Sequence, residues 1–141
     1  MSGENKYVEN PDLEAFHLFI ESKVPYDLNE RIKAFVLDIF DFVELLPKKA
    51  AGFNIQNQLV RSASSCGANY RAAKRGRSPK EYIAKLGIVE EEADECCYWL
   101  ELILATKWDL EVKTKPLLAE ANQLTAIIVS LIKTARSRLL K

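Results

Sequence analysis

The sequence is poor in the residues from which most catalytic centres are built. It contains one histidine and three cysteines, and its twenty basic and twenty acidic residues cancel to zero net charge. A di-metal bundle centre usually needs a Glu-x-x-His motif on each of two helices, so a lone histidine, His17, argues against one. No cofactor or metal is expected. Charge neutrality excludes a general attraction to nucleic acid or membrane, so any electrostatic function must come from local segregation of charge.

Long apolar runs are also missing. No segment approaches the roughly 18 uninterrupted apolar residues of a membrane span, and the first residues, MSGENKYVENPDLE, are polar and acidic, unlike a secretory signal. An odd number of cysteines does not make a disulfide framework and is typical of reduced thiols. The sequence therefore predicts a soluble cytoplasmic protein with no membrane partner and no evident small-molecule substrate.

Glycine and proline are scarce, with five of each, and strand-like alternation with hairpin turns is absent. Four stretches instead carry apolar residues at helical spacing, which predicts an all-α fold. Two starts are well marked: a capping box at Asp27 to Glu30, and Ser78 followed by Pro79 at the first helical position. The predicted helices run from Asp27 to Pro47, from about Phe53 or Asn54 to Gly76, from Ser78 to about Lys107, and from Pro116 to Leu139.

Short connections between long helices predict an up-down-up-down four-helix bundle with antiparallel helices over residues 27–141. Residues 1–26 are predicted to form a short N-terminal helical appendage. If the second and third helices fold back at Gly76, residues whose numbers sum to about 153 lie opposite each other. Gly67 then meets Gly87, which favours close helix packing over a glycine-lined anion site.

The same register predicts an ion pair between the two helices. Glu90 with Asp94, and Glu91 with Glu95, are like-charge pairs at four-residue spacing and are unfavourable on an isolated helix. A cation should compensate, and the register puts Arg61 opposite this acidic run. We therefore predict a structural ion pair made by Arg61, Glu91, Glu92 and Glu95.

Basic residues concentrate around the predicted turn. Residues 61–85 hold seven basic residues and one acidic residue, Glu81, a local net charge of +6. Cations at the end of one helix complement its dipole, but those at the start of the next do not. Such a cluster is suited to an anion such as a phosphate backbone. A solvated loop or a docking surface for an acidic protein is an equal alternative. The candidate nucleic-acid-binding residues are Arg71, Lys74, Arg75, Arg77 and Lys80.

Two other groups of residues, the cysteines and three aromatic residues, have possible functional roles. Cys66, Cys96 and Cys97 lack a neighbouring histidine, and an acidic run precedes the latter two, so they are predicted to be small core residues rather than nucleophiles. Tyr98, Trp99 and Trp108 could offer stacking platforms, but aromatic residues on amphipathic helices more often fill a core or a subunit interface.

Residues 58–103, QLVRSASSCGANYRAAKRGRSPKEYIAKLGIVEEEADECCYWLELI, resemble a bacterial four-helix-bundle family known from intervening sequences in 23S ribosomal RNA genes. The resemblance covers residues 27–139 in outline. It is specific in Arg61, Gly67 to Arg71, Arg77-Ser78, Lys85, Glu91-Glu92, Asp94-Glu95 and Tyr98-Trp99-Leu100. That family is similar in fold to the accessory variability determinant of diversity-generating retroelements, a basic homopentamer that works with a reverse transcriptase. The resemblance implies a pentameric assembly and no known catalytic activity.

These observations predict a non-enzymatic homo-oligomer, most simply a pentamer, that binds RNA, DNA or a nucleic-acid-processing protein as an accessory module. The alternative is a structural or protein-interaction scaffold without affinity for nucleic acid. The two differ in whether binding falls steeply with salt, as phosphate contacts require.

Overall fold

The structure, a computed structural model, describes residues 11–24 and 27–139. These residues form five helices and no strand, so the prediction of an all-α chain is confirmed. The remaining residues of the predicted appendage, 1–10, 25 and 26, lie outside the described part. The helices are α1 (Pro11–Glu21), α2 (Leu28–Val43), α3 (Ala50–Lys74), α4 (Pro79–Ala105) and α5 (Glu111–Leu139).

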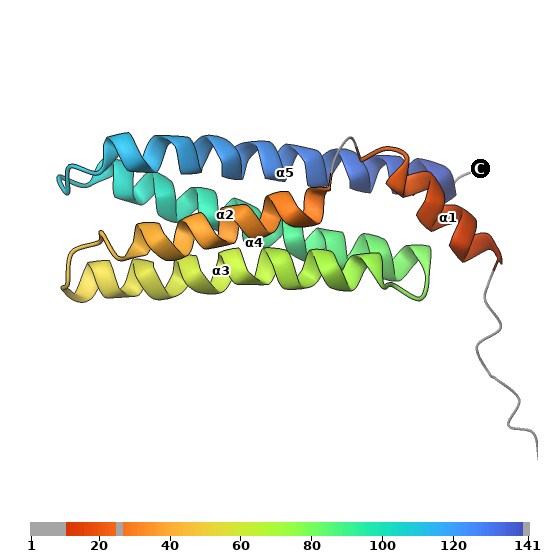
Figure 1. The fold of residues 1–141 in the computed structure, drawn as a ribbon, viewed down its shortest axis with the longest axis horizontal. Coiled ribbons are helices and arrows are strands. Elements are labelled where there is room, and N and C mark those ends of the chain that lie inside the picture. The colour runs from red at the N-terminus through yellow and green to blue at the C-terminus, as the bar shows by residue number, and fades with distance from the viewer. Residues whose placement is uncertain (1–10, 25–26, 140–141) are drawn as a thin grey trace, which may run out of the picture.

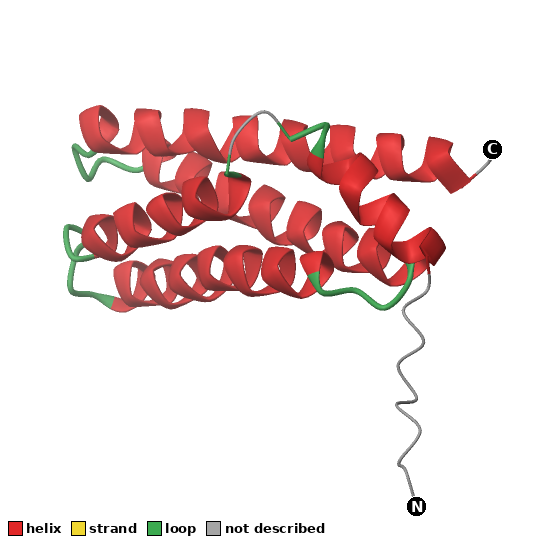
Figure 2. Cartoon of the chain, turned by 45° about the vertical axis from the view of Figure 1, so that its right-hand side comes forward, coloured by secondary structure: helices red, strands yellow, loops and turns green. Residues whose placement is uncertain are grey.

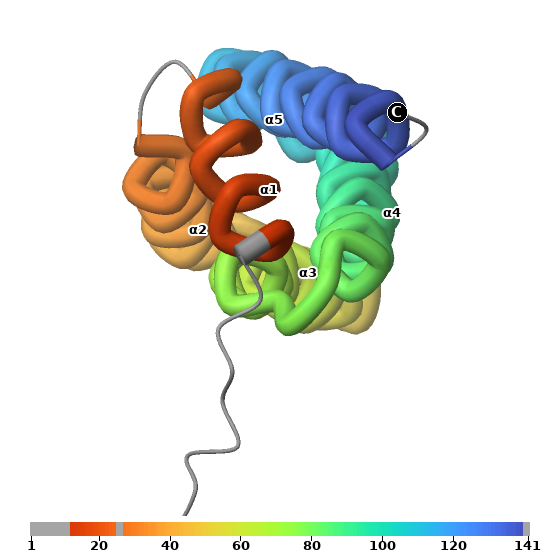
Figure 3. Tube along the Cα trace, turned by 90° about the vertical axis from the view of Figure 1, so that its right-hand side faces the viewer, coloured from red at the N-terminus to blue at the C-terminus, as the bar shows by residue number. Residues whose placement is uncertain are grey.

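Helices α2 to α5 lie side by side along the long axis of the molecule and form a helical bundle (Figure 1). Each packs against its neighbour in the chain, and α2 also contacts α5, which closes the ring seen end-on in Figure 3. The most extensive contacts join α3 to α4 and α4 to α5. Short loops connect the helices at both ends of the bundle (Figure 2).

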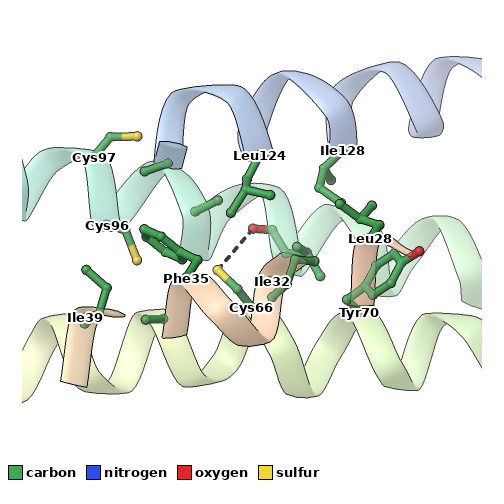
Figure 4. Close-up of a cluster of buried hydrophobic side chains, with 14 of the residues drawn as sticks. Leu28, Ile32, Phe35, Ile39, Cys66, Tyr70, Cys96, Cys97, Leu124 and Ile128 are labelled. Carbon is green, nitrogen blue, oxygen red and sulfur yellow. Dashed lines mark hydrogen bonds between the residues drawn. The ribbon is translucent and has the colours of Figure 1, made fainter. Parts of the chain in front are cut away.

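The centre of the bundle is filled mainly by apolar residues that recur at helical spacing along each helix. Leu59, Leu86, Leu100 and Ile128 are fully buried, and Figure 4 shows how side chains from all four helices meet. The apolar stripe of each sequence segment therefore faces a common core. At the surface between α2 and α5, the guanidinium of Arg31 forms an ion pair with the Glu120 carboxylate, with an N–O distance of 2.5 Å.

Both predicted helix starts are confirmed at the level of the capping atoms. The Glu30 backbone N–H donates to Oδ1 of Asp27 at 3.3 Å, and the Glu81 N–H donates to Oγ of Ser78 at 3.1 Å. These side chains satisfy amide groups that a helix leaves unpaired at its first turn. The start of α4 thus fixes where the chain reverses after α3.

The connection between α2 and α3 differs from the prediction. Helix α2 ends at Val43, before Pro47, and α3 begins at Ala50 rather than at Phe53 or Asn54. The turn is tight: a Cβ added to Gly52 would lie 1.8 Å from the Pro47 carbonyl oxygen. Glycine at this position lets the first turn of α3 pack directly on the proline, so the helix begins earlier than its apolar periodicity indicated.

The prediction that Pro116 opens the last helix is wrong, because α5 begins at Glu111 and Pro116 lies inside it. The chain reverses at Asp109, whose φ is +61°, and the Thr114 N–H and hydroxyl both donate to the Leu110 carbonyl, at 2.9 and 2.7 Å. This turn sets the helix before the proline is reached. Pro116 removes one hydrogen bond, to the carbonyl of the exposed Val112, which water can hydrate.

Helix α1 crosses the end of the bundle where α3 turns into α4 (Figure 3). Its Phe16 and Ile20 are buried in the same core, and the Phe16 ring meets Tyr82 edge to face with centroids 5.5 Å apart. Nε2 of His17 lies 3.1 Å from the Gly76 carbonyl oxygen, so the imidazole N–H can donate to the α3–α4 turn. The lone histidine therefore has a packing role here.

Helix α5 is long and apolar enough to cross a membrane by length and composition alone, with a mean hydropathy of 1.2 in its most apolar window. In the bundle, 28% of this window is buried, and the buried residues of α5 include Ala121, Leu124, Ile128, Leu131 and Ala135. One such helix is weak evidence for a membrane span, because a helix of a soluble core meets the same criterion.

Candidate binding site at the basic end of the bundle

The last turns of α3 carry three cations on the side of the helix that faces α2. Arg71, Lys74 and Arg75 are spaced at i, i+3 and i+4, so they lie on one face, and all three are exposed. Gly76 ends this run in a buried position, where a Cβ would approach the Ala73 carbonyl oxygen to 3.0 Å. The sequence thus holds three positive side chains where the negative end of the α3 dipole favours them.

These cations line a surface groove of about 570 Å³ between α2 and α3. Helix α2 contributes Asn29 and Lys33 to the opposite wall, and Gly67 and Ala68 lie on α3. No carboxylate of residues 11–24 or 27–139 lines this groove. Four positive side chains and one amide therefore surround a single hollow, hereafter called the basic groove.

Within the described residues, Arg71, Lys74 and Arg75 form no ion pair. The Lys74 ammonium lies 6.0 Å from the centre of the Tyr70 ring, and it borders a smaller hollow of 220 Å³ whose lining includes Glu21 and Asp27. Burial, with these two carboxylates nearby, raises the pKa of Tyr70 to about 12, so its phenol stays neutral at physiological pH. Among the described residues, none of these three groove cations is therefore neutralised by an ion pair.

Lys33 is the groove cation with a carboxylate partner. Its Nζ lies 3.5 Å from Oε1 of Glu30 on the same helix, and both side chains are more than 60% exposed. An exposed pair of this kind contributes little energy, so a stronger anionic ligand can displace the Glu30 carboxylate.

Arg77 and Lys80 do not line the basic groove. Arg77 lies in the α3–α4 turn, where its backbone N–H donates to Oε2 of Glu81 at 3.3 Å, and Lys80 lies in the first turn of α4. Both are exposed and, within the described chain, form no ion pair. The structure therefore brings three of the five candidate cations into one groove and leaves two beside it.

Arg61, on the side of α3 that faces α4, has a different environment. Its guanidinium lies 3.0 Å from Oε2 of Glu92 and 2.5 Å from Oε1 of Glu95. Glu95 also accepts a hydrogen bond from Nε1 of Trp99, at 3.2 Å. The α3–α4 register therefore brings one cation to two carboxylates and an indole.

This arrangement shifts the titration of both partners. The hydrogen bond from Arg61 lowers the pKa of Glu95, and the same bond raises the pKa of Arg61. Glu91, the fourth residue of the predicted ion pair, is exposed and makes no ion pair with Arg61 in the described chain. One residue from Glu92, it lies about 100° around the helix and faces solvent.

The predicted meeting of Gly67 and Gly87 is wrong. A Cβ on Gly67 would face α2, 3.7 Å from Cγ2 of Ile32 and 3.8 Å from Cγ2 of Val36, and a Cβ on Gly87 would have nothing within 4 Å. The error arises because adjacent residues lie on different faces of a helix. Cys66 and Leu86 face the core at this level, so Gly67 and Gly87, the next residue on each helix, lie on faces that do not meet.

The cysteines are core residues, as predicted: all three are free and buried. A hydrogen bond with Cys96 and burial raise the pKa of the Cys66 thiol, and burial raises that of Cys97 to about 11. Figure 4 shows Cys66 aimed at the Val89 carbonyl, 3.9 Å away. Among the described residues, no group of three or more His, Cys, Asp or Glu could hold a metal ion.

The aromatic candidates divide between surface and packing. Tyr98 is half-exposed and meets the Trp99 ring edge to face at 5.0 Å, while Trp99 and Trp108 are half-buried against the core. The ammonium of Lys49 lies 5.6 Å from the Trp108 ring. None of the three lines the basic groove.

Comparison with known proteins agrees with this architecture. The 23S rRNA-intervening sequence protein family matches residues 26–130, most of the chain and all of the basic groove. The chain belongs to this family. A crystal structure from the S23 ribosomal protein family of Bacteroides thetaiotaomicron VPI-5482, described as a protein with unknown function, is similar to it with a TM-score of 0.69 and 28% identity. The similarity covers 74% of this chain and 97% of that one; no curated protein matches.

Asn29 and Lys33 are the groove residues that the sequence did not reveal. Lys33 could have been noticed as a cation on the exposed stripe of α2, but its position opposite Arg71 depends on how α2 packs on α3. The α2–α3 connection departs from the predicted helix ends, so no register for this pair followed from the sequence.

Proposed function

We propose that this member of the 23S rRNA-intervening sequence protein family is a non-enzymatic accessory module that binds nucleic acid, or a nucleoprotein, through the basic end of an antiparallel four-helix bundle. The observation that carries the proposal is the basic groove, where Arg71, Lys74 and Arg75 meet Lys33 and no carboxylate of the described residues is in the lining. Arg77 and Lys80 extend the positive surface beyond the groove. The commonest macromolecular anion is a phosphate backbone.

Segregated charge supports this proposal in a chain whose net charge is zero. A solvated loop would not explain why these cations line a groove. The dipole of α3 accounts for Lys74 and Arg75 but not for Lys33, which lies on a different helix. Cations gathered from two helices around one hollow raise the local concentration of an anionic ligand.

We further propose that the protein assembles as a homo-oligomer, with the pentamer implied by its family resemblance as the expected size. Large apolar side chains exposed on the bundle surface support assembly, because such residues are common at subunit interfaces. They include Leu45, Ile88 and Val112. A measurement of mass in solution by light scattering tests this proposal, and a monomer at micromolar concentration would contradict it.

A non-enzymatic, cytoplasmic role is part of the same proposal. The thiols are buried, with the pKa of Cys66 and of Cys97 raised, and the one imidazole packs against the α3–α4 turn, so neither supports a nucleophile or a general base. Free thiols fit a reducing compartment. Alkylation of Cys66 in the folded protein should be slow, and rapid alkylation would argue for a reactive centre.

The experiment is a titration of labelled RNA and of labelled DNA at two salt concentrations, with two double variants. Arg71→Gln with Arg75→Gln removes two groove cations, while Lys113→Gln with Lys115→Gln removes two exposed cations from the opposite end. The groove variant should bind at least about tenfold more weakly, with a salt slope smaller by about one to two. The control should bind like the original protein.

The competing function is a scaffold that binds an acidic protein or only other copies of itself. It is favoured by the same basic groove, because an acidic protein surface also supplies anions. No binding of either nucleic acid at low salt would remove the proposed function and leave the scaffold. Equal effects of the two double variants would show that binding does not use the groove.

A further inference from the structure

The basic groove continues into an apolar one. A second hollow of about 490 Å³ lies between α2 and α3 and shares Lys33 and Gly67 with the first. Its other lining residues are Ala34, Val36, Leu37 and Ser64, which are apolar or small, and Glu30, the ion-pair partner of Lys33. The two hollows therefore adjoin at Lys33 and Gly67, with cations in one and mostly apolar side chains in the other, and together they are called the channel.

Helical spacing extends the apolar half beyond this hollow. Phe40 follows Lys33 by seven residues, and Val60 and Phe53 precede Gly67 by seven and fourteen, so each lies on the stripe of its helix that borders the channel. Phe40 is 40% exposed and Phe53 50% exposed. At 1.5 Å per residue, the α3 wall runs about 16 Å from Arg75 to Ser64 and about 33 Å to Phe53.

Gly67 lies where the two halves meet, and the fold does not require it. A Cβ at this position would make ordinary contacts with Ile32 and Val36, at 3.7 and 3.8 Å, and would clash with nothing. Alanine is much the better helix former, so glycine here weakens α3. Because Gly67 has no side chain, the surface of the channel stays open here, and another backbone can approach α3 closely.

We infer that this channel takes single-stranded nucleic acid, with phosphates on Arg71, Lys74 and Arg75 and unpaired bases on the apolar half. Single-strand sites of other folds combine a positive groove along the backbone with apolar and aromatic surfaces for the bases. A duplex keeps its bases stacked inside, so it would use the cations and leave Leu37 and Phe40 without a partner. This inference depends on the proposed function and names its ligand class.

The experiment compares a short labelled oligouridylate and the matching oligothymidylate with a duplex of equal length, at one salt concentration. The single strands should bind at least about tenfold more tightly than the duplex, and the two single-stranded arms distinguish RNA from DNA. Phe40→Ala should weaken single-strand binding about tenfold with an unchanged salt slope, because stacking does not release counterions. Tyr98→Ala, an exposed aromatic on α4, is its control and should have no effect.

Gly67→Ala and Gly87→Ala form the second matched pair. Both replace a helix-interior glycine that has room for a Cβ, so both variants should melt at the same or a higher temperature than the original protein. Only Gly67→Ala narrows the channel, and it should weaken single-strand binding at least about fivefold. An unchanged melting temperature with lost binding separates obstruction from misfolding.

Several results would overturn the inference. Equal affinity for duplex and single strand, or normal binding by both Phe40→Ala and Gly67→Ala, would remove the single-strand channel and leave the proposed basic site standing. Dissociation of a homo-oligomer by Gly67→Ala would show that a second copy fills the channel. No binding of any nucleic acid would end both the inference and the proposed function.

Discussion

The two sides of helix α3 differ in whether their arginines are neutralised by carboxylates of the same chain. On the side facing α4, Arg61 binds the carboxylates of Glu92 and Glu95 and is neutralised by its own chain. On the side facing α2, Arg71 and Arg75 line a groove to which the described part of the chain contributes no carboxylate. The same helix therefore carries one cation that holds the fold together and others that are left available.

This contrast shows that a count of basic residues does not locate a binding site. Arg61 belongs to the cationic stretch of residues 61–85 as much as Arg71 does. What separates them is the neighbouring helix, because α4 presents an acidic run while the facing part of α2 contributes Lys33 and Asn29. Four predictions test this difference.

The largest effect is expected from charge reversal. Arg61→Glu would place three carboxylates together at the α3–α4 seam and should lower the free energy of unfolding by about 2 kcal/mol, since an attraction is lost and a repulsion added at a half-exposed, solvent-screened site. Arg71→Glu should stay within about 0.5 kcal/mol. Urea denaturation of both variants measures the difference, and equal destabilisation would refute the distinction between the two sides.

Anion binding gives the next largest effect. Inorganic tripolyphosphate at ten times its dissociation constant should stabilise the original protein by about 1.4 kcal/mol, because a ligand that binds only the folded state shifts the unfolding equilibrium. The stabilisation should persist in Arg61→Gln and vanish in the Arg71→Gln, Arg75→Gln double variant. Thermal melts at matched ionic strength provide the measurement, and a response retained by the double variant would place the anion elsewhere.

Acid should remove the stability that the ion pair between Arg61 and Glu95 contributes. Because the folded-state pKa of Glu95 is lowered, its ionised form stabilises the fold above the ordinary value of 4.5, and this contribution is lost as pH falls through the folded-state pKa. The original protein should therefore lose more stability between pH 7 and strong acid than Arg61→Gln does, by about 1 kcal/mol or less. Denaturation curves at both pH values test this, and parallel losses would show that Arg61 does not act on Glu95.

The smallest effect on stability should come from removing positive charges from the groove. Arg71→Gln with Arg75→Gln removes like charges that lie close together, so the variant should be as stable as the original protein or more stable by a few tenths of a kcal/mol at low salt. Added salt should erase the gain, which urea denaturation at two ionic strengths can detect. A loss of stability greater than about 1 kcal/mol, which is more than the α3 dipole accounts for, would indicate that these arginines have partners within the fold.

Several elements of the fold could be predicted because their causes are local. Asp27 and Ser78 cap their helices with side chains three residues from the amides that they bind, so the sequence alone places those starts. The α3–α4 register followed from one turn at Gly76, and it brought Arg61 to Glu92. The start of α5 was missed, because Pro116 looks like a first helical residue and only the turn at Asp109 and Leu110 shows otherwise.

The candidate site could be predicted only in part. Arg71, Lys74 and Arg75 share a helix face by spacing alone, but Lys33 joins them through packing between helices that are far apart in sequence. Gly67 was assigned to the wrong partner helix for a related reason. The α3–α4 register says which residues of the two helices lie at the same height along the bundle, but not which face of its helix each residue occupies. Because each residue is rotated by about 100° from the one before it, the face decides whether a residue of α3 meets α4 or α2.

By itself, the sequence determined that this chain is helical, where two of its helices begin, and that positive charge gathers near one turn, since capping, periodicity and composition act over a few residues. Only the tertiary structure decided which cations are neutralised and which surround an open groove. The reason is that an ion pair or a groove needs side chains from two helices, and their relative placement is set by the burial of a shared core rather than by either helix alone.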